Sequence, residues 1–287
     1  MIYILISICC SVTVAVLLKL ARRYKINIVQ TVTWNYFFAI ILGCFFFKPK
    51  ISDLVVVPSP IYIALGILLP VIFWFLAASI KNIGIVKSDI AQRLSLFIPI
   101  LAAYFIFREQ ISNLKLFGLF LGLSAILLTL IKKEKGKKTS ANWFYAIVVF
   151  LGFGVIDILF KKLAQAQAIP YTSSLILIFA IAFLVSILSI VYEVFYKNKK
   201  LALVNLLCGG ILGLFNFGNI LFYLKAHQAL AQHPSTVFAA MNIGVIILGS
   251  LIGITLFKEK LNKINYVGLT LAVGSVLIIT LSQIYAL

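Results

Sequence analysis

The chain contains the stretch FREQISNLKLFGLFLGLSAILL at residues 107–128 and a second copy, FKEKLNKINYVGLTLAVGSVLI, at residues 257–278. The two copies lie 150 positions apart and share Phe, Glu, Gly and three Leu at matching places. Weaker matches pair residues 17–21 with 160–164 and residues 37–40 with 178–181. An aligned Glu and Gly inside a longer run are not explained by shared apolar composition, so we infer a duplication.

The composition places this chain in a membrane. Of its 287 residues, 63% are hydrophobic and 11% are charged, whereas about a quarter of the residues of a soluble domain are charged. Apolar runs of about 20 residues, the length that crosses a bilayer, predict ten helices. Their expected ranges are about 2–20, 30–47, 60–80, 89–107, 113–131, 142–161, 172–195, 203–224, 235–257 and 264–285. They leave no room for a catalytic domain outside the membrane.

The duplication divides the predicted helices into two units of five. The first occupies residues 1–131, a basic linker follows at 132–140, and the second unit occupies 141–287. Because five is odd, the second unit enters the membrane from the opposite side to the first. The predicted fold is therefore an all-α integral membrane protein built from two inverted repeats, an arrangement typical of secondary transporters that work by alternating access.

Small residues recur on one face of the fifth and tenth predicted helices. Gly118, Gly122 and Ala125 follow helical spacing in the first copy, and Gly268, Ala272 and Ser275 do so in the second. Such faces let helix backbones approach closely in lipid. We expect these two helices to cross at the symmetry axis and to act as a fixed joint.

The repeated Glu-to-Gly spacing also carries a resemblance. Glu109 precedes Gly118, Glu259 precedes Gly268, and Pro99 stands ten residues before the first Glu. Together with the duplicated five-helix unit, these residues make the chain resemble the EamA-like, ten-helix branch of the drug/metabolite transporter superfamily. The resemblance implies a multi-pass protein of the cell (inner or plasma) membrane that carries small metabolites or drugs, often as an exporter. The ninth helix departs from the pattern, with Gly249 where the fourth has Pro99.

Polar residues inside the predicted spans point to a substrate pathway, because polar groups are costly in hydrocarbon. On the fourth helix, Arg93 is a candidate for binding an anionic substrate group, with Gln92 beside it as an amide donor. The alternative is a structural ion pair with Asp89 at i−4. Both interpretations stay open.

Carboxamides on the eighth and ninth helices extend this candidate pathway. Asn216, Asn219 and Tyr223 share one face of the eighth helix, and Asn242 lies on the ninth. At the offset of 150, Asn242 corresponds to Gln92 of the fourth helix. We therefore expect these amides to face one central cavity.

Two further groups of pathway candidates carry strong alternatives. Asp157 in the sixth helix is a candidate proton- or ion-coupling acid, but Lys161 at i+4 can neutralise it. Trp34 and Asn35 on the second helix, and Trp74 on the third, have side chains that can stack on or bind a substrate. Interfacial anchoring is the alternative for both tryptophans.

The remaining residues indicate neither a cofactor nor a metal site. The four cysteines lie in apolar runs without ligand spacing, His227 and His233 have no acid or cysteine nearby at such spacing, and Glu109 and Glu259 sit at helix ends as structural residues. The expected partners are a small-molecule substrate and the lipid bilayer, without nucleic acid. Monomer and homodimer both stay open. The chain is expected not to be an enzyme, and a polytopic membrane enzyme, a channel or an assembly subunit are the alternatives.

The excess of basic residues bears on orientation. The net charge is +18, and most Lys and Arg lie in the loops on the same side as the linker at 132–140, which the positive-inside rule assigns to the cytoplasm. The family resemblance instead implies cytoplasmic termini. We favour the charge count and keep both orientations open.

Overall fold

All regular structure that the computed structural model describes is α-helical. The described residues are 1–24, 26–50, 59–83, 85–130, 144–165, 170–258 and 262–284. Their helices are α1 (Ile2–Arg23), α2 (Ile28–Phe47), α4 (Pro60–Ile83), α5 (Ile85–Leu94), α6 (Phe97–Phe105), α7 (Asn113–Leu130), α8 (Phe144–Gln165), α9 (Tyr171–Lys197), α10 (Leu203–Ala229), α11 (Pro234–Thr255) and α12 (Lys263–Ile284). The predicted linker at 132–140 and Glu259 lie outside the described residues.

Eight of these helices are long and apolar enough to cross a membrane, and two further apolar helical stretches, Ala91–Phe105 and Asn113–Thr129, are shorter. Many large apolar side chains point outward, among them Phe120, Leu188 and Phe195. In water such a surface would drive aggregation, but in lipid it is the expected exterior because the backbone polar groups are paired within the helices. The chain is a multi-pass membrane protein.

The predicted continuous helix at 89–107 is wrong, because the chain breaks there into α5 and α6. Pro99 has no N–H to donate to the carbonyl of Ser95, four residues earlier, and its ring crowds that carbonyl. The Ser95 hydroxyl instead donates to the Gln92 carbonyl over 2.6 Å, and the amide of Ile98 bonds the Ser95 carbonyl in a tighter turn. The equivalent helix α11 has Gly249 in place of the proline and is continuous.

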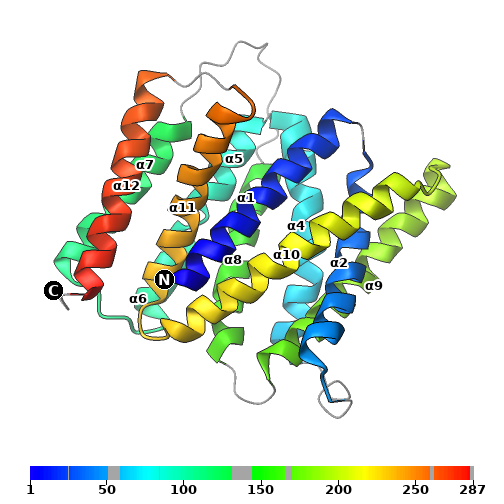
Figure 1. Cartoon of the computed structure of the whole chain (residues 1–287), viewed down its shortest axis with the longest axis horizontal. Helices are drawn as coiled ribbons and strands as arrows, with labels where there is room; N and C mark the ends of the chain where they lie inside the picture. The colour runs from blue at the N-terminus through cyan, green and yellow to red at the C-terminus, as the bar shows by residue number, and fades with distance from the viewer. Residues whose placement is uncertain are drawn as a thin grey trace.

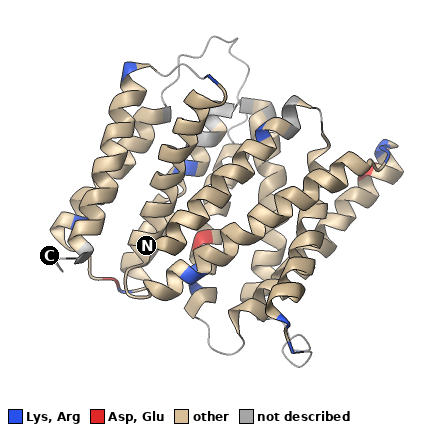
Figure 2. Ribbon diagram, viewed as in Figure 1, with Lys and Arg blue, Asp and Glu red and all other residues tan. Residues whose placement is uncertain are grey.

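Helix α1 begins and helix α12 ends at one end of the bundle, the lower side in Figure 1. The α6–α7 and α10–α11 connections lie at this same end, whereas α7 ends and α8 begins at the opposite end. We call the lower side the termini end. Figure 2 shows Lys and Arg mainly near the two ends of the helices, as expected for residues that seek water and lipid headgroups.

The small-residue faces of α7 and α12 meet as their sequences predict. A Cβ atom added at Gly118 would lie 2.8 Å from the side chain of Ile279, and one added at Gly268 would lie 2.7 Å from the backbone nitrogen of Thr129. The Ser275 hydroxyl also donates to the Gly118 carbonyl over 2.6 Å. Larger residues at these glycines would push the two helices apart.

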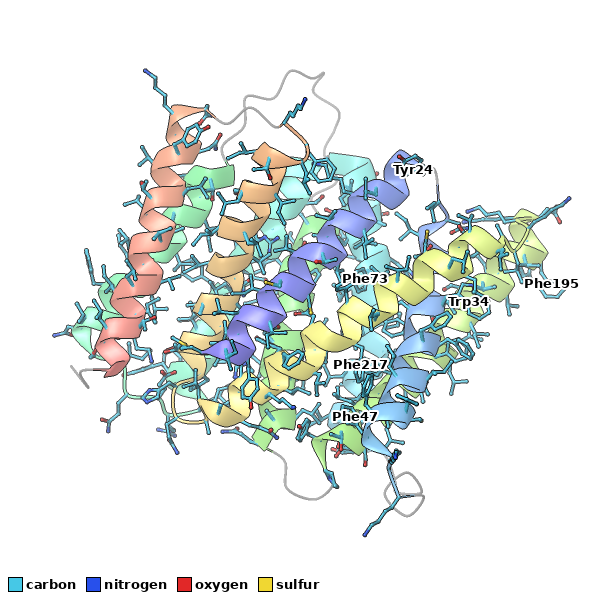
Figure 3. All side chains as sticks on the ribbon, viewed as in Figure 1. Tyr24, Trp34, Phe47, Phe73, Phe195 and Phe217 are labelled. Atoms are coloured by element: carbon cyan, nitrogen blue, oxygen red, sulfur yellow. The ribbon has the colours of Figure 1, made fainter. Side chains whose placement is uncertain are left out.

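The other helices pack in a regular set of pairs. The contacting pairs include α1 with α10, α8 with α4, α2 with α10, α9 with α4, and α2 with α9. Aromatic rings fill the contact between α2 and α10: the ring centroids of Phe47 and Phe217 lie 5.6 Å apart, and Figure 3 labels both rings at this contact. This packing leaves α8, which carries Asp157 and the buried Lys161, in contact with α10.

Four residues other than glycine have a left-handed backbone, a conformation uncommon for residues with a side chain. They are Lys48, Arg108, Asn198 and Lys258, with φ between 44° and 54°. Lys48 and Asn198 end α2 and α9, and Arg108 and Lys258 follow α6 and α11. Within each pair the two residues stand 150 positions apart.

Candidate functional site

A hydrogen bond inside the bundle joins Asp157 of α8 to Tyr223 of α10. The Tyr223 hydroxyl donates to Asp157 Oδ1 over 2.9 Å. Tyr223 is buried and Asp157 is half-buried. A carboxyl group within a membrane span is costly unless it is paired or lines an aqueous path, so this pair is the starting point of the candidate site.

Lys161, one turn beyond Asp157, has partners other than the predicted one. Its ammonium group is fully buried and donates to the carbonyl of Ala231 over 2.7 Å and to that of His227 over 3.5 Å. These carbonyls stand at the end of α10, where the last turn leaves acceptors without helical partners. The lysine therefore caps α10, and the described residues show no ion pair with Asp157, the alternative that the i+4 spacing suggested.

His227 is fully buried one turn beyond Tyr223. Its ring centroid lies 4.7 Å from that of Tyr223 and 4.8 Å from that of Phe238 on α11, both edge-on. Neither ring nitrogen has a hydrogen-bond partner among the described residues. Asp157 and Lys161 on α8 thus face Tyr223 and His227 on α10, one helical turn apart on each helix.

Glu109 lies at the termini end of the bundle, in the connection between α6 and α7. Its carboxylate is buried, forms an ion pair with Lys115, and accepts from the Ser235 backbone amide over 2.9 Å and from the Ser235 hydroxyl over 2.7 Å. Ser235 lies in the first turn of α11, where a negative charge is favourable. Burial, together with the positive charge of Lys115, lowers the pKa of nearby His233, while Glu109 opposes this shift. Glu109 thus ties the α6–α7 connection to α11.

The predicted carboxamides Gln92, Asn216, Asn219 and Asn242 lie on three helices, α5, α10 and α11. Asn219 Oδ1 accepts from the Ser7 hydroxyl over 2.8 Å, which links α10 to α1. Asn242 donates back to the Phe238 carbonyl of its own helix over 3.1 Å. Asn216 is buried on α10, and Gln92 is half-buried on α5. In the described part of the chain, no hydrogen bond joins Asn216, Asn242 or Gln92 to one another.

Trp34 and Asn35 lie in the contact between α2 and α10. A Cβ atom at Gly209 would lie 2.4 Å from Trp34 Cβ, and one at Gly213 would lie 2.8 Å from the Asn35 carbonyl oxygen. Figure 3 labels Trp34 on α2 beside α10. Neither contact involves Asp157 or Tyr223.

Trp74 of α4 and Arg93 of α5 complete the predicted set. The buried indole nitrogen Nε1 of Trp74 lacks a hydrogen-bond acceptor among the described residues. Arg93 is half-buried in the last turn of α5, where a positive charge complements the helix dipole. The side chain of Asp89 lies outside the described residues, so its predicted pairing with Arg93 stays a prediction.

Sequence reasoning missed His227 and Lys161 as parts of the site and treated Glu109 only as a helix-end residue. The signal for the first two was present: Lys161 is at i+4 from Asp157, and His227 is at i+4 from Tyr223. That spacing puts each pair on one helix face. The contact between α8 and α10, which brings the two faces together, is not encoded in any local spacing.

The chain is similar in sequence and in fold to known proteins. The model of the EamA-like transporter family matches residues 1–131. An uncharacterized protein from Haemophilus influenzae is 39% identical over 284 residues, which cover 95% of each chain. This chain belongs to the EamA-like transporter family. A crystal structure of a protein with 14% sequence identity has the same fold, with a TM-score of 0.72 over 98% of this chain and 96% of that one. Membership in the EamA-like family, a family of transporters and not of enzymes, suggests a membrane transporter of the drug/metabolite superfamily.

Proposed function

We propose that this EamA-like protein is a secondary active transporter of the cell membrane that exports a small polar or amphipathic metabolite or drug. Transport occurs by alternating access between two inverted five-helix repeats, α1 to α7 and α8 to α12. In this mechanism two packings of similar energy open the pathway to one side and then to the other. The supporting observations come from the helix contacts, the closure at the termini end and the polar groups between them.

The pairing of helix contacts carries the proposal. If the repeats correspond, α1, α2 and α4 are the counterparts of α8, α9 and α10. The contact of α1 with α10 then corresponds to that of α8 with α4, and the contact of α2 with α10 to that of α9 with α4. The contacts of α2 with α9 and of α7 with α12 join counterparts directly. Because each of these contacts has a counterpart, the two repeats can exchange conformations. The result would be a second state that is open to the opposite side and has an equivalent set of contacts.

The α7–α12 crossing supports a fixed joint for this motion. Gly118 packs against Ile279, and Gly268 packs against Thr129. Each residue of the first contact stands 150 positions from its counterpart in the second. Close backbone packing of this kind resists sliding, because the short distances leave no space for rearranged side chains. The other helices then rock about α7 and α12.

The contacts of Glu109 with Lys115 and Ser235 support closure of the pathway at the termini end. The carboxylate holds α11 through Ser235 and is neutralised by Lys115, while Lys161 holds the end of α10. The turn between α10 and α11 is therefore fixed on both sides by charged groups from other elements. We assign these contacts the role of a gate that separates when the pathway opens at this end.

The pathway itself runs past polar groups of several helices. Its proposed residues are Trp74, Gln92, Arg93, Asn216, Asn219, Tyr223 and Asn242. The orphan Nε1 donor of Trp74 supports this assignment, because a buried donor without an acceptor is costly and a substrate acceptor would satisfy it. Trp34 and Asn35, where α2 packs on α10, are also proposed pathway residues, and the buried Asn35 Oδ1 lacks a donor among the described residues.

The test begins with a thermal-shift screen of the purified protein against a metabolite library. A ligand that binds only the folded state raises the apparent melting temperature, by an amount that grows with its concentration. Hits are then assayed in proteoliposomes for saturable uptake that unlabelled substrate on the other side accelerates. Saturation with trans-stimulation supports a transporter. Unsaturable flux would indicate a channel, and chemical conversion of the ligand would indicate an enzyme.

A further inference from the structure

The imidazole of His227 is the most poorly satisfied polar group in the site. It is fully buried, and its two ring nitrogens both lack partners among the described residues. A neutral imidazole offers one donor and one acceptor, and leaving both unmet inside a protein is unfavourable. The conformation with the α10–α11 turn held closed therefore does not satisfy this side chain. A conformation that admits water to it would.

The surroundings of His227 connect it to Asp157. Tyr223 lies between them, with its ring edge-on to the imidazole and its hydroxyl bonded to Asp157 Oδ1. From α8, Lys161 bonds the His227 carbonyl, and from α11 the uncharged ring of Phe238 covers the imidazole. These are the groups that face it from α8, α10 and α11.

Two further charged residues, Glu109 and Lys225, belong to the surroundings of Asp157 and His227. Glu109, from the α6–α7 connection, interacts electrostatically with Lys161. Lys225, the remaining charge on this part of α10, lies over the rings of Tyr3 and Phe222, 5.8 Å and 5.7 Å from their centroids. The ammonium of Lys161, one turn beyond Asp157 on α8, is the charged group that is bonded to the His227 carbonyl.

Given the transport function proposed for this chain, we infer that Asp157 carries the proton that drives transport and that His227 exchanges this proton with water at the termini end. When the turn between α10 and α11 separates from Lys161, water reaches His227. The imidazole takes up a proton at one ring nitrogen. Because neither ring nitrogen is bonded to the Tyr223 hydroxyl in the observed conformation, the admitted water bridges them: the imidazolium gives a proton to this water, the water gives one of its own to the Tyr223 oxygen, and the Tyr223 hydroxyl gives its own to Asp157. An imidazolium and a carboxylate thus become an imidazole and a carboxylic acid, and the water is regenerated.

The chemistry around Asp157 favours a proton over a metal cation. Hard cations bind several oxygen ligands that all act as acceptors. The hydroxyl bonded to Asp157 is a donor in its observed bond, and the ammonium of Lys161 on the next turn would repel a cation. The described residues also contain no group of three or more His, Cys, Asp or Glu that could hold a metal ion. A proton needs only the carboxylate.

The first test labels Asp157 with dicyclohexylcarbodiimide, which reacts with protonated carboxyls in apolar surroundings. Labelling of the full-length protein in nanodiscs is located by mass spectrometry, with Asp157→Asn as the blank. We expect an adduct on Asp157 that falls about tenfold as the pH is raised through the range in which a carboxyl in apolar surroundings ionises and that sodium chloride in place of N-methylglucamine chloride does not reduce. Protection by sodium at constant pH, or labelling of folded protein without pH dependence, overturns the proton assignment.

The second test assigns the role of His227. In proteoliposomes sorted to one orientation, the pH at the termini end is changed and Asp157 labelling is followed in time. The wild type and His233→Gln, the matched variant of the other histidine, should follow the change, whereas His227→Gln should follow it about tenfold more slowly. Tyr223→Phe, which keeps the ring and removes the hydroxyl, should give the same delay and serves where His227→Gln fails to fold. If Asp157 labelling follows the pH change at the wild-type rate in both His227→Gln and Tyr223→Phe, the relay is overturned. Neither test needs the substrate, so an empty ligand screen and a failed proton test are separate results.

Discussion

Arg108 and Lys258, which stand 150 positions apart, both have a left-handed backbone, with φ of 54° and 52°. Each is the basic residue of a Phe-basic-Glu sequence that follows a helix, α6 or α11, and a residue with a side chain adopts this conformation only when its surroundings require it. The match therefore extends from the sequence to the backbone. It supports the proposal that the two halves are copies of one unit.

The first prediction concerns the joint between α7 and α12. Gly118→Leu and Gly268→Leu place a side chain where even a Cβ atom lies within 2.8 Å of the neighbouring helix. We expect each to destabilise the protein by about 1–3 kcal/mol, as overpacking does, and to lower the apparent melting temperature. Gly249→Leu is the matched control, because a Cβ atom there meets nothing within 4 Å. Equal losses at all three positions would contradict a specific joint.

The second prediction concerns the cap that Lys161 places on α10. Lys161→Met keeps the length of the side chain but removes the donor to the carbonyls of Ala231 and His227. Buried acceptors left without a donor cost about 1–3 kcal/mol, so the apparent melting temperature should fall. Lys162→Met, at the exposed neighbouring position, should leave it unchanged. If both variants melt alike, the cap adds no stability.

The third prediction concerns the gate at Glu109. Glu109→Gln keeps the shape of the side chain but leaves Lys115 buried without its counter-charge, a change that is strongly destabilising to the contact. We expect the α10–α11 turn to open, so that a cysteine introduced at Gln232 labels faster with a maleimide. Gln110→Glu, on the same connection, is the control. An unchanged labelling rate in Glu109→Gln would show that this carboxylate does not hold the α10–α11 turn closed.

The fourth prediction concerns the pathway amides. Asn216→Ala and Asn242→Ala should reduce transport of the substrate found by screening by about tenfold or more, the effect of one lost hydrogen bond to a bound polar group. The amount of protein in the membrane should stay normal. Asn82→Ala, at an exposed position on α4, is the control. Reduced protein with normal activity per molecule would make Asn216 and Asn242 packing residues.

Much of the fold follows from local sequence, and much of the site does not. Apolar length locates the long helices, and the Gly118 and Gly268 stripes locate the α7–α12 contact, because both signals lie in single segments. The break after Leu94 needed the observed backbone, since proline kinks some membrane helices and interrupts others.

The errors in the site have one physical origin. The i+4 spacing of Asp157 and Lys161 favours a pair on an isolated helix, but the packed bundle offers Lys161 the uncapped carbonyls of α10. Similarly, Glu109 was expected to be structural at a helix end, but that position did not identify its partners, Lys115 and Ser235. In each case a residue far away in the sequence supplies the partner, and such contacts are visible only after the helices are assembled.

Alternating access between two repeats is the central claim, and spin-label distances test it most directly. Labels at Arg108 and Gln232 span the termini end, and labels at Lys258 and Asn82 occupy the counterpart positions at the other end. We expect two distance populations for each pair, and a bound substrate or a change of pH should lengthen one distance as it shortens the other. Distances that widen together, or that keep a single value under all conditions, would contradict alternating access.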